Sequence, residues 1–157
     1  MGGISLIIDA NLLVLFVVGT TNRSWIARHR RLKAFSIQDF DLLCRVIGSY
    51  SQVYVTPNTL TETSNLLGYI AEPARSKVFE TFRALILSAQ EEYVQSRIAC
   101  KMMEFPHLGL TDSGLMEISS QSRSLLTTDL DLYLSALRRG ISAINFNHLR
   151  DLSMRKS

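Results

Sequence analysis

The sequence lacks a hydrophobic run long enough to cross a membrane. Its most apolar stretch, residues 4–18, carries Asp9 and Asn11 near its middle and has no basic segment before it. It is also shorter than the roughly 20 apolar residues that a spanning helix needs. Proline- or glycine-rich linkers, internal repeats and low-complexity tracts are missing too, so we expect residues 1–157 to form one domain of a cytoplasmic protein with no membrane contact.

Cysteine is scarce, and several catalytic motifs are absent. Cys44 and Cys100 lie far apart and form no CxxC pair, so we expect two reduced core thiols and no zinc site. The sequence contains no GxSxG, GxGxxG or GxxxxGK[ST] motif, which leaves serine-hydrolase and nucleotide-cradling chemistry without support. His107 and His148 are isolated from any plausible nucleophile.

The positive charge is concentrated in one segment. Hydrophobic residues (46%) and charged residues (20%) are near the globular average, and the net charge is only +3. Residues 19–36 form a predicted basic insertion, a loop or short exposed helix, with no acid between residues 23 and 33. Its functional interpretation is a nucleic-acid-binding arm, with basic groups on phosphates and a ring that stacks on a base. The alternative is a solvated loop whose tryptophan packs on the core. The residues concerned are Arg23, Trp25, Arg28, Arg30, Arg31 and Lys33.

Short apolar runs alternate with helical patterns along the chain. We predict strands at residues 4–8, 52–55, 125–128 and 142–146, and helices at 11–18, 37–50, 57–69, 73–90, 93–103, 111–121 and 129–140. Thr56 is expected to cap a helix that has Pro57 at its first position, and Thr111 or Asp112 to cap a later one. Such alternation predicts an α/β three-layer sandwich with a central, mostly parallel sheet of four to five strands.

Four acidic residues fall where this outline can bring them together. Asp9 ends the first strand, Glu62 lies in the second turn of a helix, Asp112 begins a helix, and Asp129 follows the third strand. Ligands of open α/β sheets bind beyond the carboxyl ends of the strands. Convergent carboxylates repel one another unless a cation neutralises them, and hard oxygen ligands favour Mg²⁺ or Mn²⁺. Taken singly, each acid could instead be a helix cap or a solvated helix residue.

The motifs around these acids resemble those of PIN-domain ribonucleases. The resemblance rests on IIDANLL at residues 7–13, TPNTLTE at 56–62, GLTD at 109–112 and LLTTD at 125–129. These motifs follow one another in the family's order over nearly the whole chain, and the 17-residue separation of Asp112 and Asp129 is typical of the family. Two features depart from it: residues 19–36 lengthen the connection from Asp9 to Glu62, and Asp131 adds a fifth acid.

The resemblance implies a metal-dependent endoribonuclease with a PIN-like fold. In such an enzyme Asp9, Asp112 and Asp129 would hold Mg²⁺ or Mn²⁺, with Glu62 completing the pocket directly or through a water, and Asn11 and Thr127 would orient the ligands. Asp131 would support the same pocket or serve as a first-turn helix acid. Many members of the family are toxins, so the expected partners are an RNA substrate, an antitoxin protein and a second copy of the chain.

Two other functions are open alternatives. The first is a PIN-like scaffold that binds RNA or protein without cleaving RNA. The four mutually repelling acids argue against it, because a scaffold has no use for them. A receiver-type phosphoacceptor domain would need adjacent acids after its first strand and a lysine after a late strand; this chain has Asp9-Ala10-Asn11 and no fitting lysine.

Overall fold

A parallel sheet of five strands forms the centre of the molecule. In the computed structural model, which describes residues 5–157, the strands lie in the order β3-β2-β1-β4-β5. Their bounds are Ser5–Ile8 (β1), Gln52–Val55 (β2), Gln90–Glu91 (β3), Arg123–Thr127 (β4) and Ala143–Asn145 (β5). All four pairings are parallel. Residue 4 of the predicted first strand lies outside the described residues.

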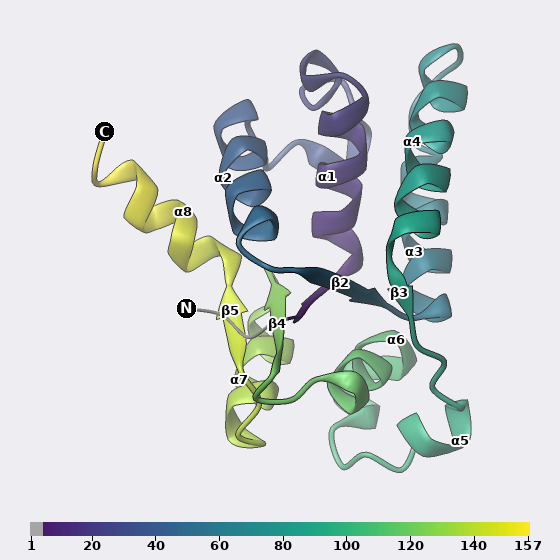
Figure 1. Ribbon diagram of the computed structural model, residues 1–157, viewed down its shortest axis with the longest axis vertical. Coiled ribbons are helices and arrows are strands. Elements are labelled where there is room, and N and C mark those ends of the chain that lie inside the picture. The colour runs from purple at the N-terminus through teal and green to yellow at the C-terminus, as the bar shows by residue number, and fades with distance from the viewer. Residues whose placement is uncertain (1–4) are drawn as a thin grey trace.

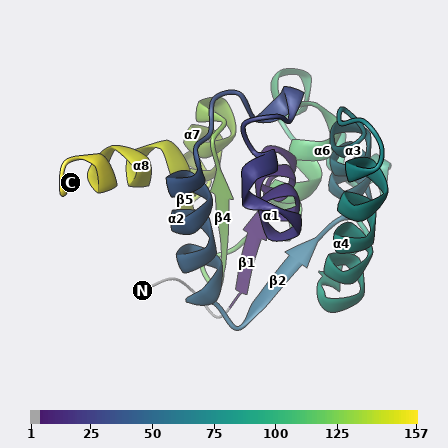
Figure 2. The same cartoon turned by 90° about the horizontal axis from the view of Figure 1, so that it is seen from above.

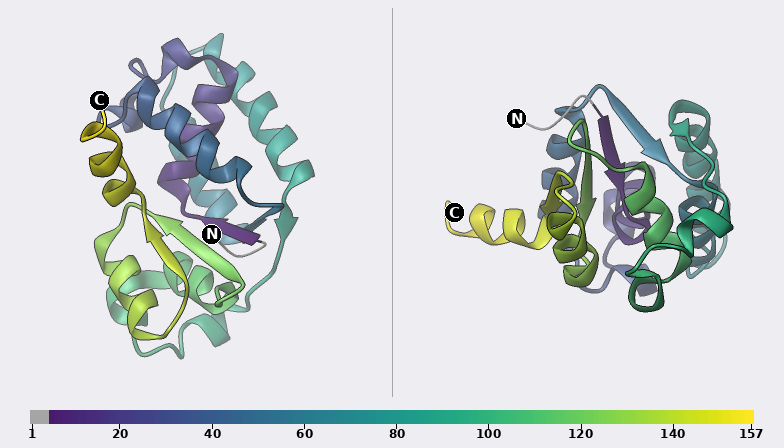
Figure 3. Two further views of the ribbon diagram at one scale, coloured as in Figure 1. Left: turned by 60° about the vertical axis from the view of Figure 1, so that its left-hand side comes forward. Right: turned by 90° about the horizontal axis from the view of Figure 1, so that it is seen from below.

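Helices cover both faces of this sheet, which confirms the three-layer α/β sandwich (Figure 1). One layer holds α1 (Ala10–Thr21), α2 (Ile37–Gly48), α3 (Pro57–Leu67) and α4 (Ala74–Ser88). The other holds α6 (Phe105–Ile118) and α7 (Leu130–Arg138), with the short α5 (Ser96–Ala99) beside α6 (Figure 3). Side chains alternate between the layers: Leu6 and Ile8 pack with the first, and Ile7 and Leu125 with the second.

The last helix, α8 (Phe146–Met154), projects from the β5 edge of the sheet and carries the C-terminus away from the body (Figure 2). Phe146 anchors its first turn in the core, while Leu152 and Met154 stay exposed. The sequence patterns did not predict this helix, because a single buried position shows no helical periodicity. Among residues 5–157, no helix is long and apolar enough to cross a membrane.

The basic insertion is folded and shorter than predicted. Residues 19–21 belong to α1, so the basic segment comprises residues 22–36, with single 3-10 turns at η1 (Arg23–Trp25) and η2 (Arg30–Leu32). Ile26, His29 and Leu32 are buried under it. The His29 ring accepts a hydrogen bond from the Arg31 N–H (3.1 Å), and its Nε2 lies 3.3 Å from the Leu67 carbonyl oxygen. The segment therefore packs against the far ends of α1 and α3.

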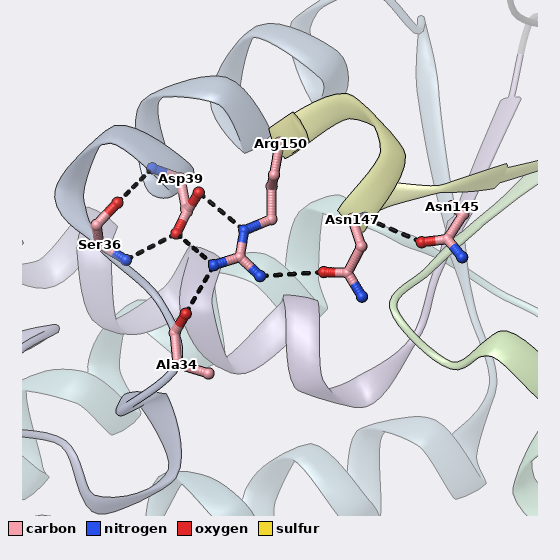
Figure 4. A network of polar contacts seen from close by, with 6 residues as sticks. All are labelled: Ala34, Ser36, Asp39, Asn145, Asn147 and Arg150. Atoms are coloured by element: carbon pink, nitrogen blue, oxygen red, sulfur yellow. Dashed lines mark hydrogen bonds and ion pairs between the residues drawn. The ribbon is translucent and has the colours of Figure 1, made fainter. Parts of the chain in front are cut away.

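Arg150 fastens the end of the basic segment to α8 and α2 (Figure 4). Its guanidinium donates two hydrogen bonds to the Asp39 carboxylate (2.9 and 3.0 Å), one to the Ala34 carbonyl (2.7 Å) and one to Asn147 (3.0 Å). Asp39 also accepts from the Ser36 N–H, and Ser36 caps α2 in return, forming a capping box.

Several predicted element bounds were wrong. The helix expected over residues 93–103 is reduced to α5, and the two-residue strand β3 precedes it. Helix α6 begins at Phe105, with Pro106 in its first turn, but it is interrupted at Gly109, and the helix expected from Thr111 or Asp112 corresponds to the part after this interruption. Neither Thr111 nor Asp112 caps it. Cys100 is exposed, not a core residue, while Cys44 is half-buried; both are free thiols.

Candidate functional site

Asp9 lies at the point where the strand order of the sheet reverses. From β1 the chain moves to β2 and β3 on one side, and β4 and β5 lie on the other, so the carboxyl ends of β1 and β4 flank the topological switch point. Crevices of this kind bind ligands in open α/β sheets. The Asp9 N–H donates to the Leu126 carbonyl (3.2 Å), and its carboxylate caps α1 by accepting from the Leu12 N–H (3.1 Å).

Thr127 connects Asp9 with Asp129 across this switch point. Its hydroxyl donates to the second carboxylate oxygen of Asp9, which also accepts from the Thr128 N–H at 3.2 Å. The same hydroxyl accepts from the Asp129 N–H at 2.9 Å. Asp129 caps α7 through Oδ1, which accepts from the Leu132 N–H (3.0 Å). Within residues 5–157 its other oxygen makes no hydrogen bond, so it remains available to a ligand.

The other two acids come from the helices that follow β2 and β3. Thr56 caps α3 by accepting from the Thr59 N–H (3.1 Å), with Pro57 at the first helical position as predicted, and this places Glu62 in the second turn. α6 is interrupted at Gly109, whose φ of 80° and ψ of −179° are confined almost entirely to glycine. The helix resumes after this break, and Asp112 lies in its first resumed turn.

The charges of the other three acids act on Asp112, and the charge of Asp129 acts on Asp9. Burial raises the pKa of Asp112 to about 7, and the negative charges of Asp9, Asp129 and Glu62 add to the rise. Burial also raises the pKa of Asp9, and Asp129 contributes, although hydrogen bonds from Thr127, Leu12 and Thr128 oppose the change. Asp9 is 6% exposed, Asp112 is half-buried, and Glu62 and Asp129 are exposed. The site thus has a buried inner acid held by hydrogen bonds, a half-buried second acid and two exposed ones.

The donor chemistry of this acidic site suits a hard divalent cation, but its carboxylates are not closed around one point. Oxygen donors alone, without a histidine or cysteine among them, are what Mg²⁺ and Mn²⁺ prefer. Across residues 5–157, no three acidic, histidine or cysteine side chains lie close enough together to hold a metal ion.

An open hollow of about 480 Å³ lies beside the acidic site. Its walls come from the exposed side of α3 and from α6, and they are mainly polar: Pro57, Asn58, Thr61, Glu62, Asn65 and Thr111. Glu62 lines the hollow itself, and Thr111, the neighbour of Asp112, lines its α6 side.

The three residues predicted to support the acids, Asn11, Thr127 and Asp131, differ in their contacts with them. Asn11 is exposed in the first turn of α1, and its side chain makes no hydrogen bond to any described residue. Asp131 faces His107 on α6, with 3.4 Å between its Oδ2 and the ring Nε2, and is not among the charges acting on Asp112. Thr127 alone of the three supporting residues touches two of the acids.

The basic residues divide into two groups. Arg23 pairs with Asp41 (2.8 Å), and Trp25 packs half-buried against the core, as in the alternative interpretation of the segment. The other group is exposed and forms no ion pair within the described part of the chain: Arg28, Arg30, Arg31 and Lys33.

One residue beside this second group was missed by the sequence analysis. The guanidinium carbons of Arg30 and Arg31 lie 5.6 and 6.0 Å from the centre of the Tyr69 ring. Tyr69 follows the end of α3 and belongs to no motif. In the helix predicted over residues 57–69, its spacing from Glu62 and Asn65 puts the three residues on one side, and this spacing is the sequence feature that could have identified Tyr69.

Comparisons with known proteins identify no family. No family model matches the chain, and no curated protein matches it. Among solved structures, the chain is similar to a domain of a functionally unknown protein from Methanocaldococcus jannaschii DSM 2661, with 19% sequence identity and a TM-score of 0.41. The alignment covers 90% of this chain and 89% of that one. A likeness of this size carries no argument about function.

Proposed function

We propose that this protein is a divalent-metal-dependent ribonuclease that hydrolyses RNA phosphodiester bonds. The observation that carries the proposal is that Thr127 links Asp9 and Asp129 at the switch point of a parallel sheet, while the charges of both acids and of Glu62 act on Asp112. Acids that repel one another in this way destabilise the fold, and a bound cation would neutralise their charge and remove this repulsion. The resemblance of the four motifs to PIN domains supports the same function.

Each acid has a distinct part in this proposal. Asp9 is held by three hydrogen bonds, so it would supply a fixed oxygen, and Thr127 would keep it aligned with Asp129. Asp112 and Asp129 would complete the ligand set, and the exposed Glu62 would join directly or through a water. Bound there, Mg²⁺ or Mn²⁺ would activate water and stabilise the charge that develops on the phosphate.

RNA is the proposed substrate because unpaired positive charge lies at the C-terminal end of α3, the helix that also carries Glu62. The exposed basic residues of segment 22–36 can neutralise phosphates of a polyanion whose backbone reaches the acidic site. An antitoxin partner and a homodimer are further proposals that rest on the resemblance alone.

The test is cleavage of mixed RNA in Mg²⁺ or Mn²⁺, with and without a chelator, by three proteins. The unmodified chain should cut only with metal, and Asp112→Asn should lose activity because it removes a ligand charge but keeps the shape. Asp131→Asn is the matched control: it makes the same change on an acid paired with His107, and it should stay active. Chelator-resistant cleavage, or an active Asp112→Asn protein, would contradict the proposal.

A non-cleaving scaffold is the second candidate, favoured by the fact that no three ligands among the described residues close on one point. Such a protein would bind RNA with equal affinity before and after Asp112→Asn and would leave the RNA intact in both metals.

A further inference from the structure

We propose that Tyr69, flanked by Arg30 and Arg31, is a base-stacking subsite that draws single-stranded RNA along the exposed side of α3 toward the acidic site. This inference deepens the proposed function and rests on it in taking RNA as the ligand. It assigns the stacking role to Tyr69, a residue outside every motif, in place of Trp25, which packs against the core.

The subsite combines an open ring with two unpaired cations. Tyr69 is 49% exposed, and the guanidinium carbons of Arg30 and Arg31 lie 5.6 and 6.0 Å from its ring centre. Both arginines are exposed, and in the described part of the chain neither forms an ion pair. Proteins bind single strands with this pairing of elements, since a base stacks on the ring while the adjacent phosphate meets the cations.

The basic segment is built so that the two arginines stay at this ring. His29, buried between them and the core, accepts a hydrogen bond from the Arg31 N–H and contacts the Leu67 carbonyl at the end of α3. Tyr69 is tied to the end of α3, because its N–H donates to the Leu66 carbonyl (3.3 Å). The backbone contacts therefore position the cations and the ring together before any ligand arrives, which lowers the entropy lost on binding.

The hollow beside the acids occupies part of the path from Glu62 to the ring. Positions 58, 62 and 65 fall on one side of α3, where Asn58, Glu62 and Asn65 line the hollow of about 480 Å³. At 1.5 Å per residue, the end of α3 at Leu67 lies roughly 8 Å beyond Glu62 along the axis, and Tyr69 follows this end after Gly68. A strand with one base on Tyr69 would therefore continue along this side of α3 to reach the acids.

The required ligand is single-stranded. A base inside a duplex already has both faces stacked and cannot lie on the tyrosine ring, whereas an unpaired base can. The asparagines of the hollow offer neutral hydrogen-bonding groups beside the strand and no further charge, so phosphate attraction is concentrated at the two arginines.

The test measures binding, separately from cleavage. The full-length chain in chelator is titrated into a short fluorescent single-stranded RNA and followed by anisotropy. Tyr69→Ala should raise Kd about 5- to 100-fold, and Tyr69→Phe, which keeps the ring, by less than about twofold. Tyr93→Ala is the matched control: Tyr93 is more exposed (71%), and no arginine of the described chain lies over its ring. It should leave Kd unchanged.

The arginine pair keeps the inference falsifiable if Tyr69→Ala folds poorly, and a duplex RNA supplies a second control. Arg30→Ala with Arg31→Ala should lower the slope of log K against log salt by up to about two, because two phosphate contacts are lost. With the same sequence as a duplex, Tyr69→Ala should make no difference. If Tyr69→Ala binds single strands as tightly as Tyr93→Ala, or Tyr69→Phe is as weak as Tyr69→Ala, the subsite is overturned; the face would then suit a protein partner.

The two proposals fail separately. Metal-dependent cleavage with no effect of Tyr69→Ala on Kd leaves the ribonuclease standing and refutes the subsite. A ring-dependent Kd without any cleavage refutes the ribonuclease and supports the subsite in a binding scaffold. Absence of RNA binding by the unmodified chain overturns both.

Discussion

Replacing Asp112 with asparagine should make the metal-free protein more stable above neutral pH, although it removes a native side chain. Asp112 has a pKa of about 7 in the folded protein against an ordinary 3.8, because of burial and the charges of Asp9, Asp129 and Glu62. At 1.36 kcal/mol for each pH unit, ionising it costs the folded state about 4 kcal/mol relative to the unfolded chain. Solvent screens the half-buried carboxylate, so we expect roughly 2–4 kcal/mol.

The sign of the pH dependence follows from proton binding. Between about pH 4 and pH 7 the folded protein holds a proton on Asp112 that the unfolded chain has lost, so the free energy of unfolding falls as pH rises through this window. Asparagine cannot titrate. The variant and the parent should therefore have equal stability near pH 4 and should diverge up to pH 8, with the variant the more stable.

The assay is thermal melting in chelator from pH 4 to pH 9, with Glu117→Gln, an exposed acid on the same helix, as the matched control. For a chain of this size each kcal/mol moves Tm by about 2–4 °C, so Asp112→Asn should gain roughly 5–15 °C at alkaline pH, and Glu117→Gln almost nothing. Adding Mg²⁺ should raise the Tm of the parent far more than that of the variant. Parallel profiles for Asp112→Asn and the parent would refute the coupling of the four acids.

The remaining predictions concern how the site is supported. Gly109→Ala should lower the free energy of unfolding, measured in urea, by about 1–3 kcal/mol. The added Cβ has no atom within 4 Å, but the backbone at Gly109 lies in a conformation reserved for glycine. Gly48→Ala, where φ is ordinary, should show no such loss. Arg150→Ala should cost about 1–3 kcal/mol, since it leaves a shielded carboxylate and a carbonyl without their donor, whereas Arg83→Ala at an exposed pair should cost about 1 kcal/mol or less. Equal losses in the two arginine variants would contradict this account.

Local pattern was enough for the parts of the fold that depend on neighbours in the chain. The apolar run 4–8 predicted a strand buried on both faces, which residues 5–8 form. Thr56 before Pro57 predicted the start of α3, because a cap and a strand are stabilised within a few residues. The same logic placed Asp9 and Asp129 at strand ends, where both cap helices.

The local sequence pattern did not predict β3, the start of α6 or α8, and each has a physical reason. β3 has two residues and exists only because it pairs with β2. α6 begins before a break at Gly109, so its helical pattern appeared to start later. α8 has one buried anchor, and its orientation depends on Arg150 reaching Asp39, more than a hundred residues earlier in the chain.

The acidic site was likewise predictable from the sequence only in part. Which residues could be ligands followed from residue type and order, since carboxylates after strands and at helix starts are local features. Three features depend on distant segments packing together. Thr127 hydrogen-bonds to both Asp9 and Asp129, and three other charges raise the pKa of Asp112. Tyr69, not Trp25, lies beside Arg30. Contacts of this kind are set by the geometry of the closed core, which no window of neighbouring residues encodes.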